Sequence, residues 1–124
     1  MKYEFSVRLT DNDGLGHVNN AVYIKYLFES IHFFAVKEML VLHPGLKPTE
    51  IYIEYNDSIH YGDKVVVECW EVNQETNSKQ NKESKEATYQ RSFCFEILNN
   101  DKAVCKAKMK LALYPKAKSF YSNL

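Results

Sequence analysis

The sequence predicts an α+β fold in which one antiparallel five-stranded sheet wraps around a single long central helix. Residues 21–42 contain no Gly or Pro and carry apolar side chains around most of the helical circumference, which is typical of a buried helix. Several other stretches alternate apolar and polar residues with the period of two expected for strands. A helix that needs burial nearly all round, and one sheet to bury it, imply a sheet that curls around the helix.

The length and charge of the chain limit what it can be. Its 124 residues fit one domain, residues 1–124, and 45% apolar residues can supply a core. Sixteen acidic side chains balance sixteen basic ones, so no overall charge draws the protein to nucleic acid or to an anionic membrane. The first ten residues lack the apolar run of a signal peptide, and no segment is long enough to span a bilayer. We therefore expect a cytoplasmic protein with neither a nucleic-acid nor a membrane partner.

The first half of the chain predicts a strand, a loop and the helix. Residues 2–10 alternate apolar and polar side chains and predict a strand with one buried face. Two glycines and several Asx residues then mark an irregular loop over residues 11–17. Asn19 and Asn20 are candidate helix caps, so the helix should begin near Asn20. The Gly and Pro residues within 42–48 should end the helix.

The second half of the chain predicts four strands. Alternating patterns occupy residues 51–56, 65–70, 87–97 and 103–113, with turns at residues 61–63 and 99–101. The polar run 77–85 predicts a solvated loop, and the residues after Pro115 look peripheral. Short connections allow these four strands to form an antiparallel meander. Because a single sheet has two open edges and covers the helix incompletely, we expect a homodimer or homotetramer, with sheets joined edge to edge or helices packed together.

The segment from Asp11 to Asn20 is the strongest candidate for chemistry. It places two carboxylates, a histidine and two glycines directly before a helix N-terminus, where unpaired N–H groups and the helix dipole favour an anion or a developing oxyanion. The same field would keep Asp13 ionised, so that it can act as a base or nucleophile. The alternative is structural, because Asp and Asn near a helix start are most often caps.

Other binding patterns fail on spacing, so we expect no metal and no cofactor. A calcium loop that begins at Asp11 would need a bidentate carboxylate where Val22 stands. A dinucleotide fingerprint would need a third glycine after Gly14 and Gly16. The cysteines have no CxxC spacing, which favours reduced buried thiols over a disulfide framework. The histidines also lack zinc-ligand spacing; they are His17, His32, His43 and His60.

Residues 11–26, DNDGLGHVNNAVYIKY, resemble the D-x-D-x-x-G-H-V-x-N-x-x-Y-x-x-Y signature of hotdog-fold acyl thioesterases. That family includes the hydroxybenzoyl-CoA thioesterase-like group and the plant acyl-carrier-protein thioesterases. IYIEY at residues 51–55 and YGDKV at 61–65 are similar to its second strand and following turn. The resemblance covers residues 7–67 and implies a single hotdog thioesterase domain that hydrolyses acyl-CoA or acyl-carrier-protein thioesters without a cofactor.

The resemblance also implies roles for individual residues. Asp13 would be the catalytic carboxylate, which either attacks the thioester carbonyl or activates a water. Asn20 falls where the family uses a backbone N–H to polarise that carbonyl, and His17 would orient water or substrate or hold the loop. Four further residues fall near the substrate, namely Gly16, Asn19, Tyr23 and Glu29.

Two features keep alternatives open. The plant enzymes carry Asp, Asn and His in D-x-N-x-H spacing, and Leu15 stands where their asparagine would be. Tyr23 has a spacing more typical of a helix core than of a catalytic residue. Glu29 ranks second to Asp13 as the catalytic carboxylate, and the alternative for it is a structural role. A hotdog hydratase or dehydratase would need a His and carboxylate pair, for which only His17 lies near the motif. A non-catalytic module that binds acyl-CoA or acyl carrier protein is the third hypothesis.

Overall fold

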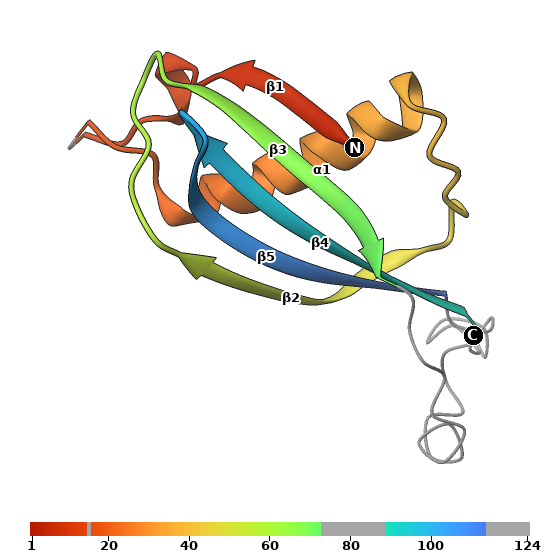
Figure 1. Ribbon diagram of the computed structural model, residues 1–124. Coiled ribbons are helices and arrows are strands. Elements are labelled where there is room, and N and C mark those ends of the chain that lie inside the picture. Colours follow the sequence, from red (N-terminus) through yellow and green to blue (C-terminus); the bar gives the residue numbers. More distant parts are fainter. Residues whose placement is uncertain (15, 73–88, 114–124) are drawn as a thin grey trace, which may run out of the picture.

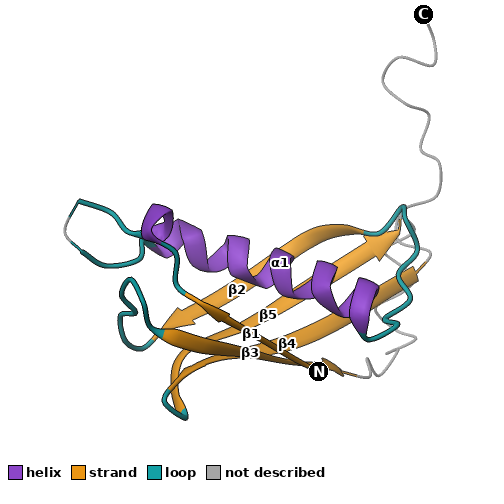
Figure 2. Ribbon diagram, turned by 90° about the horizontal axis from the view of Figure 1, so that it is seen from above, coloured by secondary structure: helices purple, strands orange, loops and turns teal. Residues whose placement is uncertain are grey.

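The computed structural model describes residues 1–14, 16–72 and 89–113, and it confirms the predicted α+β class. One helix lies across one face of a five-stranded antiparallel sheet (Figures 1 and 2). The elements are β1 (Lys2–Ser6), a short 3₁₀ turn (Leu9–Asp11), α1 (Asn20–Lys37), β2 (Lys47–Tyr55), β3 (Lys64–Val72), β4 (Tyr89–Asn99) and β5 (Lys102–Leu113). The predicted loop 77–85, the strand start at 87–88 and the segment after Pro115 lie outside the described residues.

The strand order is β1-β3-β4-β5-β2, so the predicted four-stranded meander is wrong. Only β3, β4 and β5 follow one another in the sheet, while β2 pairs with β5 at one edge and β1 pairs with β3 at the other. Alternation indicates which residues share a face and says nothing about which strand is the neighbour. The connection from β2 to β3 therefore crosses the end of the sheet (Figure 1), and it passes the segment before α1.

The inward face of the sheet follows the predicted alternation. Its buried side chains are Val65, Val67 and Cys69 of β3, Phe93, Phe95 and Ile97 of β4, and Cys105, Ala107, Met109 and Leu111 of β5. One departure is a register shift in the β4–β5 pair, which buries Val104 where the alternation had pointed Ala103 inward. Asn100 and Asp101 both have positive φ, 50° and 63°, as a two-residue hairpin turn requires, which confirms the turn predicted there.

Three element boundaries differ from the predictions by four residues or more. β1 ends at Ser6 instead of residue 10, because the chain turns through the 3₁₀ segment at Leu9–Asp11. α1 ends at Lys37 instead of residue 42, since Met39 adopts a φ of 59° that no helix accommodates. β2 begins at Lys47 instead of residue 51, and it tolerates Pro48 because it lies at an edge of the sheet.

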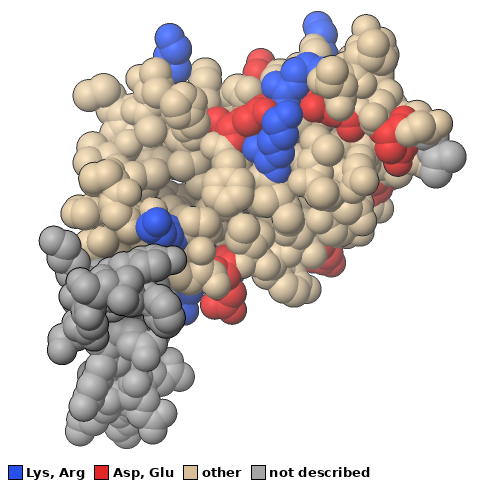
Figure 3. All heavy atoms as spheres, turned by 180° about the vertical axis from the view of Figure 1, so that it is seen from behind, with Lys and Arg blue, Asp and Glu red and all other residues tan. Residues whose placement is uncertain are grey.

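The helix is buried along one face only, so the predicted burial nearly all round is wrong for the single chain. Its buried residues are Tyr23, Tyr26, Leu27, Ser30 and Phe34. On the opposite side Phe28 is 40% exposed and Val36 is 58% exposed, because the sheet lies on one side of the helix (Figure 2). Figure 3 shows the uncovered side, where a band of acidic and basic residues crosses a largely uncharged surface and further charged residues lie toward the rim. No helix in the described parts of the chain has the length and apolar character to cross a membrane.

All three cysteines carry free thiols. Cys69 and Cys105 are buried, and burial raises the pKa of each to about 12. Cys94 is half-buried on β4. The prediction of reduced thiols therefore holds, with burial for two of the three.

Candidate active site

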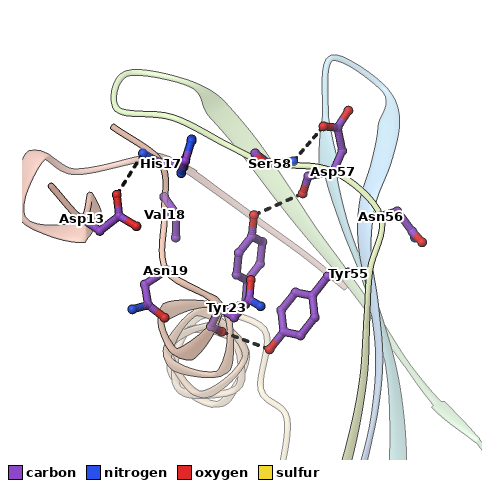
Figure 4. A pocket seen from close by; sticks show the side chains of 10 residues that line it. Asp13, His17, Val18, Asn19, Tyr23, Tyr55, Asn56, Asp57 and Ser58 are labelled. Carbon is purple, nitrogen blue, oxygen red and sulfur yellow. Dashed lines mark hydrogen bonds between the residues drawn. The ribbon is translucent and has the colours of Figure 1, made fainter. Parts of the chain in front are cut away.

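A cavity of about 540 Å³ lies where the loop before α1, the first turn of the helix and the segment after β2 meet (Figure 4). Its two sides come from segments that are far apart in the sequence. They meet because the β2–β3 connection crosses the end of the sheet and passes the segment before α1. The cavity is lined by Asp13, His17, Val18, Asn19, Asn20, Tyr23, Tyr55, Asn56, Asp57 and Ser58.

The loop that carries Asp13 is closed by its own backbone. The Asp13 N–H donates to the His17 carbonyl at 2.8 Å, and the Gly16 N–H donates to the Asp13 carbonyl at 3.2 Å. Asp13 Oδ1 in turn lies 3.4 Å from the His17 N–H, and Figure 4 shows this contact at the edge of the cavity. Gly16 has a φ of 89°, a conformation that favours glycine, and its role is to let the chain turn back. Gly16 itself is not part of the cavity wall.

The first residue of α1, Asn20, lines the cavity, and its backbone donor is open with respect to the described residues. Asn19 is the N-cap, and its Oδ1 accepts a hydrogen bond from the Ala21 N–H at 2.9 Å, as the capping alternative predicted. The next donor, the Asn20 N–H, has no acceptor within residues 1–14, 16–72 and 89–113. This group lies at the positive end of an 18-residue helix, where it can bind a ligand oxygen with partial negative charge.

Two tyrosines form the inner wall of the cavity. Tyr23 is 2% exposed, and its ring lies edge-on to the Tyr55 ring with 5.3 Å between centroids. The Tyr23 hydroxyl donates to the Asp57 carbonyl at 3.4 Å, while the Tyr55 hydroxyl donates to the Asn20 carbonyl at 3.1 Å. Burial raises the pKa of both phenols, so both stay protonated at neutral pH and donate these bonds. Helix and sheet are thereby joined across the cavity.

The segment after β2 is held in place by the bulge of β5. The N–H groups of Asn56 and Asp57 both donate to the Val104 carbonyl, at 2.9 and 3.1 Å. Lys102 pairs with the Asp57 carboxylate at 2.7 Å, and this bond, with a second from the Ser58 N–H, holds the pKa of Asp57 below its usual value. In Figure 4 the Asp57 carboxylate points away from the Asp13 side of the cavity.

His17 has a second imidazole as its neighbour. The rings of His17 and His60 meet edge to face with 5.7 Å between centroids, and their backbones form an isolated antiparallel bridge. The Val18 N–H donates to the Ile59 carbonyl at 3.1 Å beside them. The His60 N–H donates to the Asp63 carboxylate at 2.9 Å. These contacts attach the loop before the helix to the β2–β3 connection.

The structure brings five of the seven expected site residues together at the cavity and leaves Gly16 and Glu29 outside its wall. Asp13, His17, Asn19, Asn20 and Tyr23 line the cavity. Glu29 lies in a separate hollow of about 570 Å³ on the uncovered side of α1, where the Arg8 guanidinium bonds both of its oxygens at 2.9 Å. No sequence pattern pointed to Ser58 or Asp57, since both belong to a turn that only the strand order brings to the helix.

This arrangement can polarise a carbonyl and deliver a base to it. A carbonyl oxygen on the Asn20 N–H would lie in the positive field of the helix end. The Asp13 carboxylate faces the same cavity, and His17 lies next to it. The combination of a fixed backbone donor and a nearby carboxylate is the minimum that acyl transfer to water requires.

Comparison with known proteins agrees with this geometry. Residues 1–112 match the model of the acyl-ACP thioesterase C-terminal domain. Among curated proteins no relative matches the sequence. Solved structures with the same hotdog fold include a hypothetical protein from Aquifex aeolicus, with 19% identity, a TM-score of 0.72, and coverage of 93% of this chain and 100% of that one.

Two further structures of the same fold are thioesterases. A thioesterase from Thermus thermophilus, complexed with coenzyme A and zinc, has 21% identity and a TM-score of 0.69, and the match covers 93% of this chain and 84% of that one. A 1,4-dihydroxy-2-naphthoyl-CoA thioesterase from Synechocystis has 20% identity and a TM-score of 0.71, with 90% and 79% covered. At these identities the structural likeness establishes the hotdog fold.

Proposed function

Since the chain belongs to the family of acyl-ACP thioesterase C-terminal domains, we propose that it hydrolyses acyl thioesters in the cavity between Asp13 and the start of α1. The observation that carries the proposal is that the Asp13 carboxylate and Asn20, whose helix N–H is open, line the same cavity. The family and the thioesterase neighbours support hydrolysis of a thioester. Thiol-release assays with both kinds of substrate distinguish a CoA thioester from a carrier-protein thioester.

The reaction follows from where the groups lie. The thioester carbonyl oxygen binds the Asn20 N–H, which stabilises the negative charge that develops on that oxygen. Asp13 takes a proton from a water whose oxygen attacks the carbonyl carbon, or its carboxylate attacks directly and the resulting anhydride is hydrolysed. In the first route the C–S bond breaks and the thiol leaves with the proton that Asp13 took from the water. In the second route the thiolate leaves when the anhydride forms, and it takes a proton released from the water that then hydrolyses the anhydride. His17 orients the water or the substrate beside Asp13.

We further propose that the working form is a homodimer or homotetramer. β2 is an open edge of nine residues, and the cavity segment follows directly after it. Pairing of β2 edges between two copies would satisfy the free backbone groups and bring a second chain beside the cavity. The uncovered apolar side of α1 supports the same proposal. Sedimentation analysis of the purified chain tests it, and a monomer at assay concentrations would contradict it.

The first experiment measures thiol release from short, long and aromatic acyl-CoAs and from the matching acyl-carrier proteins. The protein's own thiols are subtracted with a substrate-free blank. Asp13→Ala and Asp13→Asn should remove turnover while circular dichroism and thermal unfolding stay close to wild type, because Asp13 is exposed and lies outside the core. A folded Asp13→Ala variant with full activity would refute the assignment. Binding without turnover for every thioester would instead favour the non-catalytic module.

The presence of His17 and Asp13 on one cavity supports a hydratase as the second candidate. That reaction adds water across the double bond of an enoyl thioester and needs a His and carboxylate pair for proton transfer. Incubation with an enoyl-CoA followed by chromatography separates the two. Free thiol as the product supports the thioesterase, and a hydroxyacyl-CoA with its thioester intact supports the hydratase.

A further inference from the structure

Asp11 is a buried carboxylate to which the proposed reaction gives no role. It is 2% exposed, and among the acidic residues that the structure describes it is the only buried one. Placing a carboxylate away from water destabilises the fold unless the charge is compensated by hydrogen bonds. Its surroundings therefore indicate what it does.

One oxygen of Asp11 accepts three hydrogen bonds. Oδ2 lies 2.9 Å from the Tyr26 hydroxyl and 3.1 Å from both the backbone N–H and the Nε of Arg8. Lys25 Nζ lies 3.9 Å from the other oxygen. Burial by itself would raise the pKa of Asp11, but the bonds from Tyr26 and Arg8 outweigh it and lower that pKa, so the group stays ionised at neutral pH.

The same cluster attaches the loop to the helix at a second point. Arg8 Nη2 bonds both oxygens of Glu29 at 2.9 Å, one helical turn beyond Tyr26. The chain before the cavity is thus tied to α1 through two neighbouring turns of the helix. Asp13, two residues after Asp11, begins the small loop that His17 closes with a 2.8 Å backbone bond.

We propose that Asp11 is a positioning residue, whose buried carboxylate holds the loop that carries Asp13 at a fixed place against α1. The helix supplies the Asn20 N–H and the loop supplies Asp13, so the distance between the two groups depends on how the loop is tied to the helix. A displacement of about 1 Å in such a pair lowers turnover by up to about 100-fold in other enzymes. The inference rests on the proposed role of Asp13 in hydrolysis.

The test uses Tyr26→Phe, which removes one hydrogen bond to Asp11 and keeps the ring in the core, and Asp11→Asn, which removes the charge. Tyr61→Phe makes the same chemical change as the first variant on an exposed tyrosine of the β2–β3 connection and is the matched control. We expect kcat to fall about tenfold in both test variants while KM stays within about twofold, because Asp13 is displaced and substrate contacts are retained. The control should match wild type in both constants.

Amide hydrogen exchange supplies a readout that does not depend on activity. The N–H groups of Asp13 and Gly16 should exchange about tenfold faster in both test variants, while amides of β4 keep their wild-type rates. Unchanged loop exchange, an equal rise in β4, or an unchanged kcat would overturn the positioning role. If Asp11→Asn does not fold, Tyr26→Phe decides alone. If wild type hydrolyses no thioester, the proposed function fails, and the exchange rates still decide whether Asp11 holds the loop.

Discussion

The hydroxyl of Tyr55, the last residue of β2, lies 3.1 Å from the carbonyl oxygen of Asn20, the first residue of α1, and donates a hydrogen bond to it. The N–H of the same peptide group, that of Ala21, is bound by the Asn19 side chain at 2.9 Å. The peptide that follows the proposed oxyanion donor is therefore held at both ends. An edge strand and a helix cap together fix the orientation of the first helical turn.

Tyr55→Phe should lower kcat about three- to tenfold and leave KM within about twofold, since one hydrogen bond contributes roughly 0.5–1.5 kcal/mol. The ring stays in place against Tyr23, so the inner wall of the cavity is preserved. Steady-state kinetics on the preferred thioester measure the effect. Tyr61→Phe, at a 58% exposed position in the β2–β3 connection, is the control. An equal loss in the control would show that the effect is not specific to the Asn20 contact.

Asn19→Ala should lower the free energy of unfolding by about 1 kcal/mol, because it leaves the Ala21 N–H without its side-chain acceptor. Urea unfolding followed by circular dichroism measures the loss. Asn19→Asp should recover it, since a carboxylate also accepts the Ala21 N–H and interacts favourably with the helix dipole. Stability equal to wild type in the alanine variant would mean that water replaces the cap completely.

The half of the site that is local in sequence could be predicted, and the half that depends on strand order could not. Asp13, His17, Asn19, Asn20 and Tyr23 lie within one turn and one helix start, so their spacing alone brings them to one cavity. Tyr55, Asp57 and Ser58 reach it because β2 pairs with β5 and its connection crosses the sheet end. Hydrophobic alternation carries no information about that pairing.

The errors in the helix have a similar cause. The end of α1 at Lys37 depends on a positive φ at Met39, a residue type that gives no local stop signal. The apolar residues on the far side of the helix predicted burial on every side, and one sheet covers one side only. The ion pair between Arg8 and Glu29 joins residues from a turn and a helix, and the pattern of polar residues on the helix did not show which partner each would take.

Asp11 should make the stability of the protein depend on pH in the acid range. Its pKa is lowered in the folded state, so between the folded and unfolded pKa values the unfolded chain binds more protons. The stabilisation is therefore present above the unfolded value, about 4, and is lost as pH falls through the folded value. Asp11→Asn should be about 2–3 kcal/mol less stable than wild type at pH 7, with a difference that shrinks below about pH 4.

Urea unfolding of both proteins between pH 7 and pH 2 measures this difference. Glu54→Gln, which changes an exposed carboxylate on β2, is the control and should parallel wild type over the whole range. A constant difference between Asp11→Asn and wild type down to pH 2 would show that the charge of Asp11 does not stabilise the fold.

Gly16 and Gly14 provide a matched pair for the loop that carries Asp13. A Cβ on either residue would meet no atom within 4 Å, so crowding cannot separate the two substitutions. Of these two glycines only Gly16 has a positive φ, 89°, which an L-residue adopts at a cost of about 1–2 kcal/mol. Gly16→Ala should therefore lower the free energy of unfolding by about that amount if the loop keeps its conformation. If the loop shifts instead, kcat should fall about tenfold, because the Gly16 N–H closes the turn onto the Asp13 carbonyl at 3.2 Å. Gly14→Ala should retain wild-type stability and turnover, and an equal effect of the two substitutions in urea unfolding and steady-state kinetics would exclude backbone conformation at Gly16 as the cause.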